Sequence, residues 1–308
     1  MNQPLISVII PAKDAQDSLK KCLDSLLNLE YKDFEIIVID DGSRDNTALI
    51  LKEYAAKITL ITNPSALGPS LSRNAAARLA RGEYLAFTDS DCMADKFWLK
   101  ELLSGFDGAD TVSVGGIQDV PQDESDFGLQ VSRFMRKIGF ILDYIHLDRG
   151  KMFPVSHNPS CCAMYRKDVF LKEGGFLSGM WPGEDVELDY RLKKKGYRLI
   201  FNPKAVVYHY RPDNLKKFSR MMLRYGIAQG FLVRRYGVFR KIHFLPFCSA
   251  ALLGLFILFG YTNLFYALLA LLAAFVLAAV YLSGAYPCLL ALVTLFYWHL
   301  GFIKGFFR

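Results

Sequence analysis

Acidic side chains come soon after three short apolar runs in the first hundred residues. They are Asp14, Asp40, Asp41, Asp89 and Asp91. Carboxylates gathered at one place repel one another unless a positive group lies among them. A divalent cation carrying a diphosphate would relieve that repulsion, and Mg²⁺ or Mn²⁺ needs only one or two protein carboxylates besides the substrate phosphates. The pattern therefore predicts a metal-diphosphate site, although each acidic pair alone also fits a helix cap or a surface loop.

The elements around these residues alternate between strand and helix. Strands are predicted at 6–10, 35–39, 58–61 and 84–88, with helices at 19–27, 43–56 and 71–80 between them. Further strands are predicted within 111–120, at 161–164, at 198–201 and at 206–208, and a helix at 185–195, whereas 122–150 gives no definite prediction. Such alternation predicts a parallel sheet covered by helices on both faces. Ligands bind such sheets at the carboxyl ends of the strands, where the acidic residues lie.

The C-terminal part of the chain has a different composition. Residues 244–303 contain no Asp, Glu, Lys or Arg, and about 20 apolar residues are enough to cross a bilayer. Turn-forming residues divide the block into candidate spans at 244–260, 264–282 and 286–303. Two spans with an interfacial helix are the alternative to three. A transporter is disfavoured because no charged residue in the block marks an ion path.

Basic residues cluster immediately before this apolar block. They are Lys216, Lys217, Arg220, Arg224, Arg234, Arg235, Arg240 and Lys241, interleaved with apolar side chains. This pattern is typical of an amphipathic helix at a membrane surface, on the cytoplasmic side. A solvated basic face is the alternative. Because the net charge of +7 is concentrated here, it does not indicate nucleic-acid binding.

The cysteines and the N-terminus point to a cytoplasmic location. None of the 6 cysteines forms a CxxC pair, so neither a disulfide framework nor a zinc site is predicted from their spacing. The first residues have no apolar leader, so no cleaved signal peptide is predicted. We expect a multi-pass protein of the cell membrane with its catalytic domain in the cytoplasm.

Four segments together resemble the family-2 inverting glycosyltransferases, which have a GT-A fold. They are 7–11, 35–43, 68–74 and 84–91, and the resemblance extends over residues 5–210. It implies a Rossmann-like mixed, mostly parallel sheet with helices on both faces. The implied donor is a nucleoside diphosphate sugar bound with Mn²⁺ or Mg²⁺.

The resemblance also assigns roles on the donor side of the site. Pro11, Asp14 and Asp40 would line the nucleoside pocket, with Asp40 on the base and Asp41 beside it. Arg73 would lie near the nucleotide and Asp89 near the ribose and sugar, while Asp91 would bind the metal. His209 is a further candidate metal ligand, and a structural histidine in the core is its alternative. Lys13 and Asp14 depart from the aromatic residue and Asn common in the family.

The acceptor side depends on the acidic pair Glu184-Asp185. By resemblance Asp185 is the catalytic base, because an inverting transfer needs a carboxylate to take the proton of the acceptor hydroxyl. Without the resemblance, an ordinary acidic first helical turn explains the pair. His157, Asn158, Trp181 and Glu184 would lie on the acceptor side, with Trp181 stacking on a sugar or packing in the core.

The sequence thus predicts three regions. These are a catalytic domain at 1–212, a basic interfacial segment at 213–243 and a membrane region at 244–308. The predicted activity is transfer of a sugar to a lipid, lipid-linked or other membrane-proximal acceptor by a single metal-assisted displacement. A nucleotidyltransferase and a non-catalytic nucleotide-sugar-binding membrane protein are the alternatives.

Overall fold

The computed structural model describes residues 3–139, 150–262 and 284–308, with the isolated residues 266 and 277. These residues form two compact units. The first contains the described residues up to Asp123 and from 150 to Tyr210, and the second contains 124–139 and the described residues from Arg211 onward. Residues 124–139 belong to the second unit. The domain boundary at 212 stays a prediction.

The described strands of the first unit form one mixed sheet, in the order β3-β2-β1-β4-β8-β6-β9-β5, with β7 paired to β9. The strands are β1 (Ile6–Ala12), β2 (Phe34–Asp40), β3 (Thr59–Thr62), β4 (Tyr84–Phe87), β5 (Cys92–Ala94), β6 (Thr111–Asp119), β7 (Phe153–Pro154), β8 (Ala163–Arg166) and β9 (Arg198–His209). Strands β1 to β4 are mutually parallel, as predicted. Strand β8 runs antiparallel to both β4 and β6. The two strands predicted after 198 are one continuous strand, β9, whose pairing with β6 includes register shifts.

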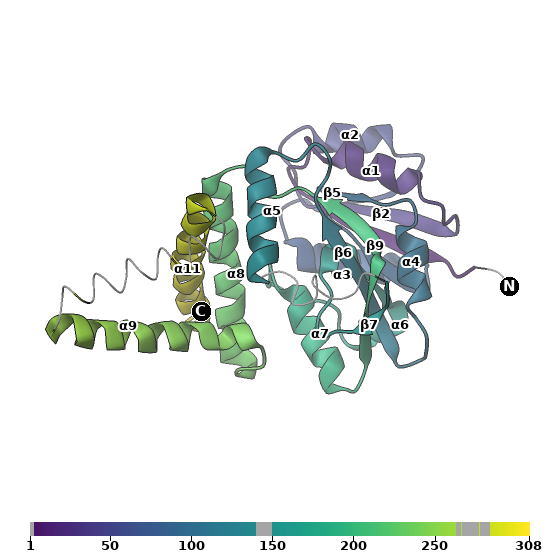
Figure 1. The fold of residues 1–308 in the computed structure, drawn as a ribbon. Helices are drawn as coiled ribbons and strands as arrows, with labels where there is room; N and C mark the ends of the chain where they lie inside the picture. The colour runs from purple at the N-terminus through teal and green to yellow at the C-terminus, as the bar shows by residue number, and fades with distance from the viewer. Residues whose placement is uncertain (1–2, 140–149, 263–265, 267–276, 278–283) are drawn as a thin grey trace. The chain divides into compact units, whose positions relative to one another are not determined.

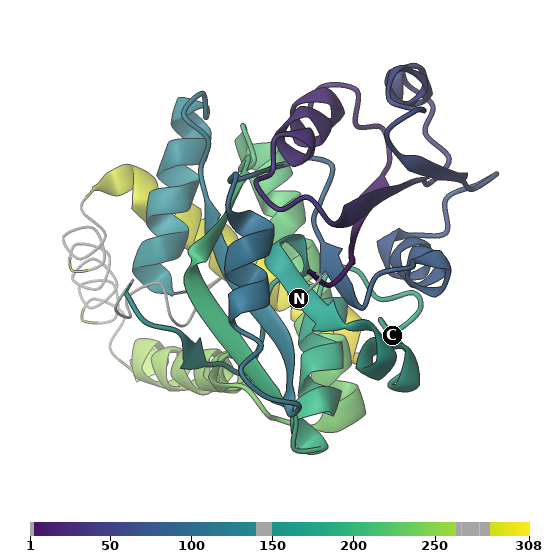
Figure 2. The same ribbon diagram turned by 90° about the vertical axis from the view of Figure 1, so that its right-hand side faces the viewer.

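Helices cover both faces of this sheet (Figures 1 and 2). In the first unit they are α1 (Leu19–Leu27), α2 (Thr47–Glu53), α3 (Pro69–Leu79), α4 (Trp98–Ser104), α6 (Lys167–Lys172) and α7 (Glu184–Lys194), with the 3₁₀ helix η1 (Ser160–Cys162). Alternate residues of β1, Ile6 and Val8, pack into one apolar core with the buried faces of α1 and α4. Phe87 of β4 contacts the rings of Phe170 and Phe176 in a second buried group. This two-sided burial confirms the predicted α/β architecture.

The parallel strands bring their carboxyl ends to one edge of the sheet. Ala12 at the end of β1 is the register partner of Asp40 at the end of β2. Strand β4 pairs with the other side of β1 and ends at Phe87, two residues before Asp89. Because parallel strands end at the same edge, the residues that follow β1, β2 and β4 lie on the ligand-binding side of the sheet.

The second unit is helical among its described residues. Its elements are α5 (Asp126–Ile138), α8 (Leu215–Tyr236), the 3₁₀ helix η2 (Lys241–Phe244), α9 (Leu245–Thr262) and α11 (Ala285–Phe306). Helices α5, α8 and α11 share an apolar core and can be seen together in Figure 1. Helices α8 and α11 approach backbone to backbone: a Cβ added to Gly226 would lie 2.1 Å from the carbonyl oxygen of Trp298, and one added to Gly301 would lie 2.2 Å from that of Leu223. Small residues permit this distance, as they do between membrane helices.

Two described helical stretches are long and apolar enough to cross a membrane. They are Lys241–Leu258 and Tyr286–Phe306, and they overlap the predicted spans at 244–260 and 286–303. The predicted span at 264–282 lies outside the described residues, apart from 266 and 277. Length and composition alone make these helices candidates.

Candidate active site

The two adjacent carboxylates after β2 have different surroundings. Both side chains are almost fully buried. Asp41 accepts hydrogen bonds from the amide of Asn63 at 2.7 Å, the backbone N–H groups of Leu67 and Gly68 at 2.9 Å each, and the hydroxyl of Ser72 at 3.1 Å. Burial alone would raise the pKa of Asp41, but these donors outweigh it and hold the pKa below its usual value. Asp41 therefore holds the loop before α3, and its place on the donor stays a prediction.

Asp40 is less heavily bonded. Its Oδ1 accepts one hydrogen bond, from the backbone N–H of Ser43 at 3.0 Å. The loop after β1 contacts the same region, because Asp14 accepts from the N–H of Arg44 at 2.8 Å and donates its own N–H to the hydroxyl of Ser43 at 3.0 Å. Asp14 has a left-handed backbone with φ of 48°, and half-buried Pro11 precedes it by three residues. The fold thus joins the loops that carry Pro11, Asp14 and Asp40.

Arg73 of α3 connects the end of β4 with the start of α7. Its guanidinium is 1% exposed. Nη1 lies 2.7 Å from Oε1 of Glu184, and Nη2 contacts Oδ1 of Asp89. Burial lowers the pKa of Arg73, but the two carboxylates outweigh it, so the pKa is raised and the guanidinium keeps its charge. Nε of Arg73 and Oε2 of Glu184 are buried without a hydrogen-bond partner among the described residues.

Glu184 has an unusual titration. Burial raises its pKa to about 7, the neighbouring Arg73 opposes the rise, and the negative charge of Asp185 adds to it. A carboxyl with a strongly shifted pKa and a specific charged partner is a candidate functional-site residue. Glu184 is the buried partner of Arg73, and its acceptor-side role stays a prediction.

Asp185 is presented at the first turn of α7. The helix begins after Gly183, whose φ of 98° is a left-handed conformation. Oδ2 of Asp185 accepts the backbone N–H of Ser160 at 2.9 Å, while the hydroxyl of Ser160 lies 3.4 Å from Oε1 of Glu184. Asp185 is half-buried, so its carboxylate is oriented by η1 without being closed off from solvent. This arrangement suits a general base.

Asp91 and His209 come together because β5 and β9 are paired. Cys92 of β5 is the register partner of His209, the last residue of β9. Nε2 of His209 lies 3.5 Å from Oδ1 of Asp91, and its Nδ1 lies 3.3 Å from Oε1 of Gln118. One ligand atom from each of Asp89, Asp91, Cys92 and His209 lies within 4.8 Å of the others. Carboxylate oxygens with one imidazole are donors that Mn²⁺ or Mg²⁺ accepts, so the residues fit the predicted cation.

Two predicted acceptor-side residues are held in the interior. Asn158 is 0% exposed, and its Nδ2 donates to the hydroxyl of Ser113 at 3.0 Å and to the carbonyl of Ile200 at 3.1 Å. Nδ1 of His157 lies 3.2 Å from Oδ2 of Asp189, which also accepts the N–H of Asn158 at 2.7 Å. Asn158 therefore holds the segment before η1 in place, and its acceptor-side role stays a prediction.

Some contributors were not predicted from the sequence. Asp189 is buried, and burial raises its pKa against the effect of His157. Its spacing of four residues from Asp185 on one helix face was the available signal. Trp181 is 51% exposed, so the alternative that it is a core residue is wrong. Its sugar-stacking role stays a prediction.

Six of the predicted residues form one connected series in the first unit. Asp185 is adjacent to Glu184, Glu184 pairs with Arg73, and Arg73 pairs with Asp89. Asp91 follows two residues later and lies beside His209. The base side and the metal side of the site are therefore linked by a single buried guanidinium.

The sheet order, the strand-end carboxylates and the covering helices define a GT-A fold. The chain shares this fold with the mannosyltransferase PcManGT from Pyrobaculum calidifontis, solved in complex with GDP-Man and Mn²⁺, with a TM-score of 0.75 and 18% identity over 99% of this chain and 87% of the other. Staphylococcus aureus TarS 1-349 in complex with UDP-GlcNAc matches with a TM-score of 0.53 and 19% identity, over 77% of this chain and 68% of the other.

The chain belongs to glycosyl transferase family 2, whose sequence profile matches residues 7–174. A Methanococcus voltae relative is 25% identical over 98% of this chain and 96% of its own length, and is named a dolichyl N-acetyl-α-D-glucosaminyl phosphate 3-β-D-2,3-diacetamido-2,3-dideoxy-β-D-glucuronosyltransferase. The pre-mycofactocin glycosyltransferase of Mycobacterium tuberculosis is 28% identical over 75% of this chain. The chain spans 48% of that relative's length.

Proposed function

We propose that this glycosyltransferase is anchored in the membrane. It would transfer a sugar, with inversion, from a nucleoside diphosphate sugar to a hydroxyl of a lipid-linked acceptor. The observation that carries the proposal is the Asp89–Arg73–Glu184 bridge, which joins the candidate metal ligands to the candidate base. A site for a single displacement needs both groups on one rigid framework.

On the donor side, Asp40, Pro11 and Asp14 would contact the nucleoside at the ends of β1 and β2. Asp91 and His209 would hold Mn²⁺ or Mg²⁺, with Asp89 beside them. The bound cation would neutralise the charge that develops on the leaving diphosphate. Buried Arg73 holds Asp89 in place and adds a fixed positive charge near the donor.

On the acceptor side, Asp185 would remove the proton of the acceptor hydroxyl while the hydroxyl oxygen attacks the anomeric carbon of the donor sugar. The backbone N–H groups of Ser160 and Val186 each donate to one oxygen of this carboxylate, which fixes its orientation, and each oxygen keeps a further lone pair that can accept the proton. An exposed Trp181, four residues earlier, would stack against the acceptor sugar.

Membrane anchoring is proposed from the second unit. Lys216, Arg220 and Arg224 recur every four residues and are exposed on α8, and α9 and α11 include the two candidate spans. A basic helix face beside apolar spans binds anionic lipid on the cytoplasmic side. Besides the M. voltae relative, an Escherichia coli relative, 37% identical over 30% of this chain and 36% of its own length, is named UDP-Glc:α-D-GlcNAc-diphosphoundecaprenol β-1,3-glucosyltransferase WfgD. These names favour a polyprenyl-linked sugar as acceptor.

The decisive experiment is a thermal-shift screen of the full chain in detergent, with nucleoside diphosphates and with or without Mn²⁺. We expect one base to stabilise the protein in a metal-dependent way, by about 2.7 kcal/mol at a ligand concentration 100 times Kd. Asp91→Asn should remove the metal-dependent part of the shift. Asp33→Asn, on an exposed residue just before the opposite end of β2, is the matched control and should keep it.

Product analysis then separates the alternatives. A glycosyltransferase releases nucleoside diphosphate from its donor, whereas a nucleotidyltransferase releases monophosphate or pyrophosphate. Nucleotide binding without any release from all common donors and lipid acceptors would favour the non-catalytic alternative.

A further inference from the structure

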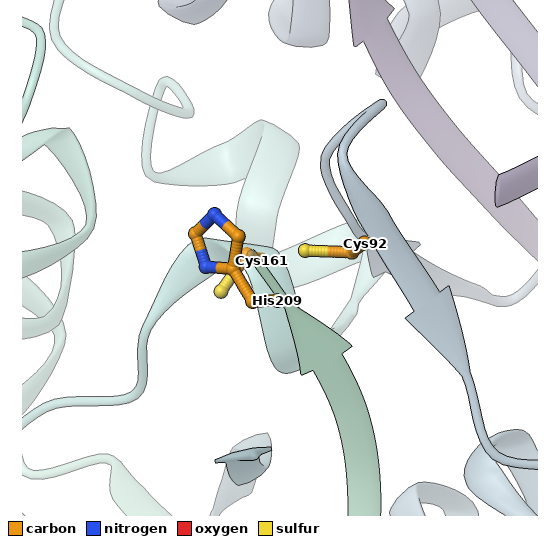
Figure 3. Close-up of side chains that lie close together, drawn as sticks. All are labelled: Cys92, Cys161 and His209. Atoms are coloured by element: carbon orange, nitrogen blue, oxygen red, sulfur yellow. The ribbon is translucent and has the colours of Figure 1, made fainter. Parts of the chain in front are cut away.

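Two buried thiols and an imidazole converge beside the candidate cation site. Cys92 lies on β5, Cys161 in η1 and His209 at the end of β9, and Figure 3 shows the sulfur of Cys92 pointing toward the other two side chains. One ligand atom from each lies within 4.8 Å of the others. Cys92 is 1% exposed and Cys161 is 5% exposed. Both cysteines are reduced thiols.

Tertiary structure alone creates this cluster. More than forty residues separate Cys92 from Cys161 in the sequence, and more than forty separate Cys161 from His209. The antiparallel register of β5 and β9 places Cys92 opposite His209. The turn of η1 before β8 brings Cys161 to the same point, in the core that also contains Cys92. Each ligand is thus carried by a different rigid element of the first unit.

The donor set differs in chemistry from the carboxylates next to it. Two thiolates and one imidazole select thiophilic cations such as Zn²⁺, whereas carboxylates suit Mg²⁺ and Mn²⁺. With Zn–S distances of about 2.3 Å and Zn–N distances of about 2.0 Å, tetrahedral ligands lie roughly 3.5 Å apart. Ligand atoms within 4.8 Å of one another reach that spacing by side-chain rotation.

We propose that Cys92, Cys161 and His209 form a binding site for Zn²⁺ or another thiophilic divalent cation. A carboxylate oxygen of Asp91, 3.5 Å from His209 Nε2, is the nearest candidate for the fourth position. Each coordinating thiol loses its proton to solvent as its sulfur binds the cation. His209 belongs to this set and to the proposed Mn²⁺ set, so the two cations exclude each other. The mutual exclusion of the two cations rests on the proposed function, whereas the binding site for Zn²⁺ does not.

The first test is cobalt binding to the full chain, purified in detergent under reducing conditions and freed of metal with a chelator. Co²⁺ at one equivalent per chain should produce the intense sulfur-to-cobalt charge-transfer absorption of a thiolate site. One equivalent of Zn²⁺ should abolish it. Absence of that absorption would overturn the proposal, because cobalt on carboxylates alone lacks it.

Variants then locate the site. Cys92→Ser and Cys161→Ser should each weaken Zn²⁺ binding on the order of 100-fold, because each removes one of three protein ligands. Cys162→Ser is the matched control: this thiol is equally buried and adjacent, but its sulfur lies 3.9 Å from the carbonyl of Ala205. Wild-type affinity in both ligand variants would place the ion elsewhere and refute the assignment.

A measurement on the unmodified protein covers the case in which a variant does not fold. X-ray absorption of the zinc-loaded chain should give two sulfur neighbours at about 2.3 Å and at least one nitrogen neighbour at about 2.0 Å. A shell of oxygen and nitrogen atoms only would refute the site.

The exclusion is tested separately, by adding Zn²⁺ to the Mn²⁺-dependent reaction. Zinc should inhibit release of nucleoside diphosphate, and Cys161→Ser should raise the zinc concentration needed. Zinc binding with unchanged turnover would overturn the exclusion. A chain that binds zinc on cysteines but never releases nucleotide from any donor would contradict the proposed function and leave the zinc site standing.

Discussion

The two acidic pairs, Asp40-Asp41 and Glu184-Asp185, are alike in one respect: in each pair the two carboxylates have different hydrogen-bond and ion-pair partners. In each pair one carboxylate is bound to side chains or loops of other elements. Asp41 accepts four hydrogen bonds around the loop before α3, and Glu184 forms an ion pair with Arg73. The other member is bonded to backbone N–H groups: Asp40 accepts one, from Ser43, and half-buried Asp185 accepts two, from Ser160 and Val186. The two carboxylates of each pair therefore have different hydrogen-bond partners, and their proposed roles depend on this difference.

The two pairs differ in how the structural member is satisfied. Neutral donors surround Asp41 and hold its pKa low, whereas Glu184 is paired with a buried cation and has one oxygen without a hydrogen-bond partner in the described part of the chain. Several hydrogen-bond donors hold the pKa of Asp41 below its usual value, whereas burial raises the pKa of Glu184 to about 7 although Arg73 opposes the rise.

The largest expected effect is on Asp185. Asp185→Asn keeps the shape of the side chain but cannot accept a proton, so we expect turnover to fall by about 10²- to 10⁴-fold. Donor affinity should change little, because the donor-binding residues belong to other elements. Steady-state rates and nucleotide thermal shifts measure both. Wild-type turnover would indicate either that Asp185 is not the base or that the acceptor is an already ionised phosphate.

Asp41→Asn should act on stability more than on chemistry. The amide cannot accept from all four donors, and each hydrogen bond to a charged group contributes about 1.5–3 kcal/mol, so we expect a loss of about 3 kcal/mol in the free energy of unfolding. Asp40→Asn is the matched comparison and should weaken donor binding at nearly unchanged stability. The reverse result would exchange the roles of the two residues.

The effect of Asp41 should also depend on pH. Its pKa is lower in the folded state than in the unfolded chain, so its stabilisation is complete above the unfolded value of about 3.9 and is lost as pH falls through the folded value. Thermal unfolding of wild type and Asp41→Asn should therefore converge in acid. A constant difference at all pH values would contradict the ionised assignment.

Glu184→Gln should give the smallest of these changes, which is a change in how steeply the free energy of unfolding depends on pH. The folded state keeps a proton on Glu184 up to a pKa of about 7, above the unfolded value of about 4.3. This group therefore lowers the stability of the wild type as pH rises between those values. The variant should lack that contribution. Identical pH dependence of Tm in the two proteins would mean that Glu184 is ionised throughout.

The contrast between the two units shows where prediction from sequence succeeded. In the first unit, apolar runs followed by Asp40 and by Asp89 and Asp91 predicted the strands and the edge at which the residues meet. In the second unit, the absence of charge in 244–303 predicted apolar helices. The sequence did not predict that residues 124–139 belong to the second unit. The apolar residues of α5 show that one face of the helix is buried, but they do not identify the helices that bury it.

The sequence by itself determined the residue types, the period of each element and the order of the family motifs, because these are local properties of the chain. Tertiary structure decided that Asp41 accepts four hydrogen bonds around the loop before α3 and that Asn158 is buried. It also decided that Arg73 joins two carboxylates. It brought Cys92, Cys161 and His209 to one point through the β5–β9 register and the turn at η1. These features depend on contacts between residues far apart in the chain, and strand register and burial specify such contacts only after folding.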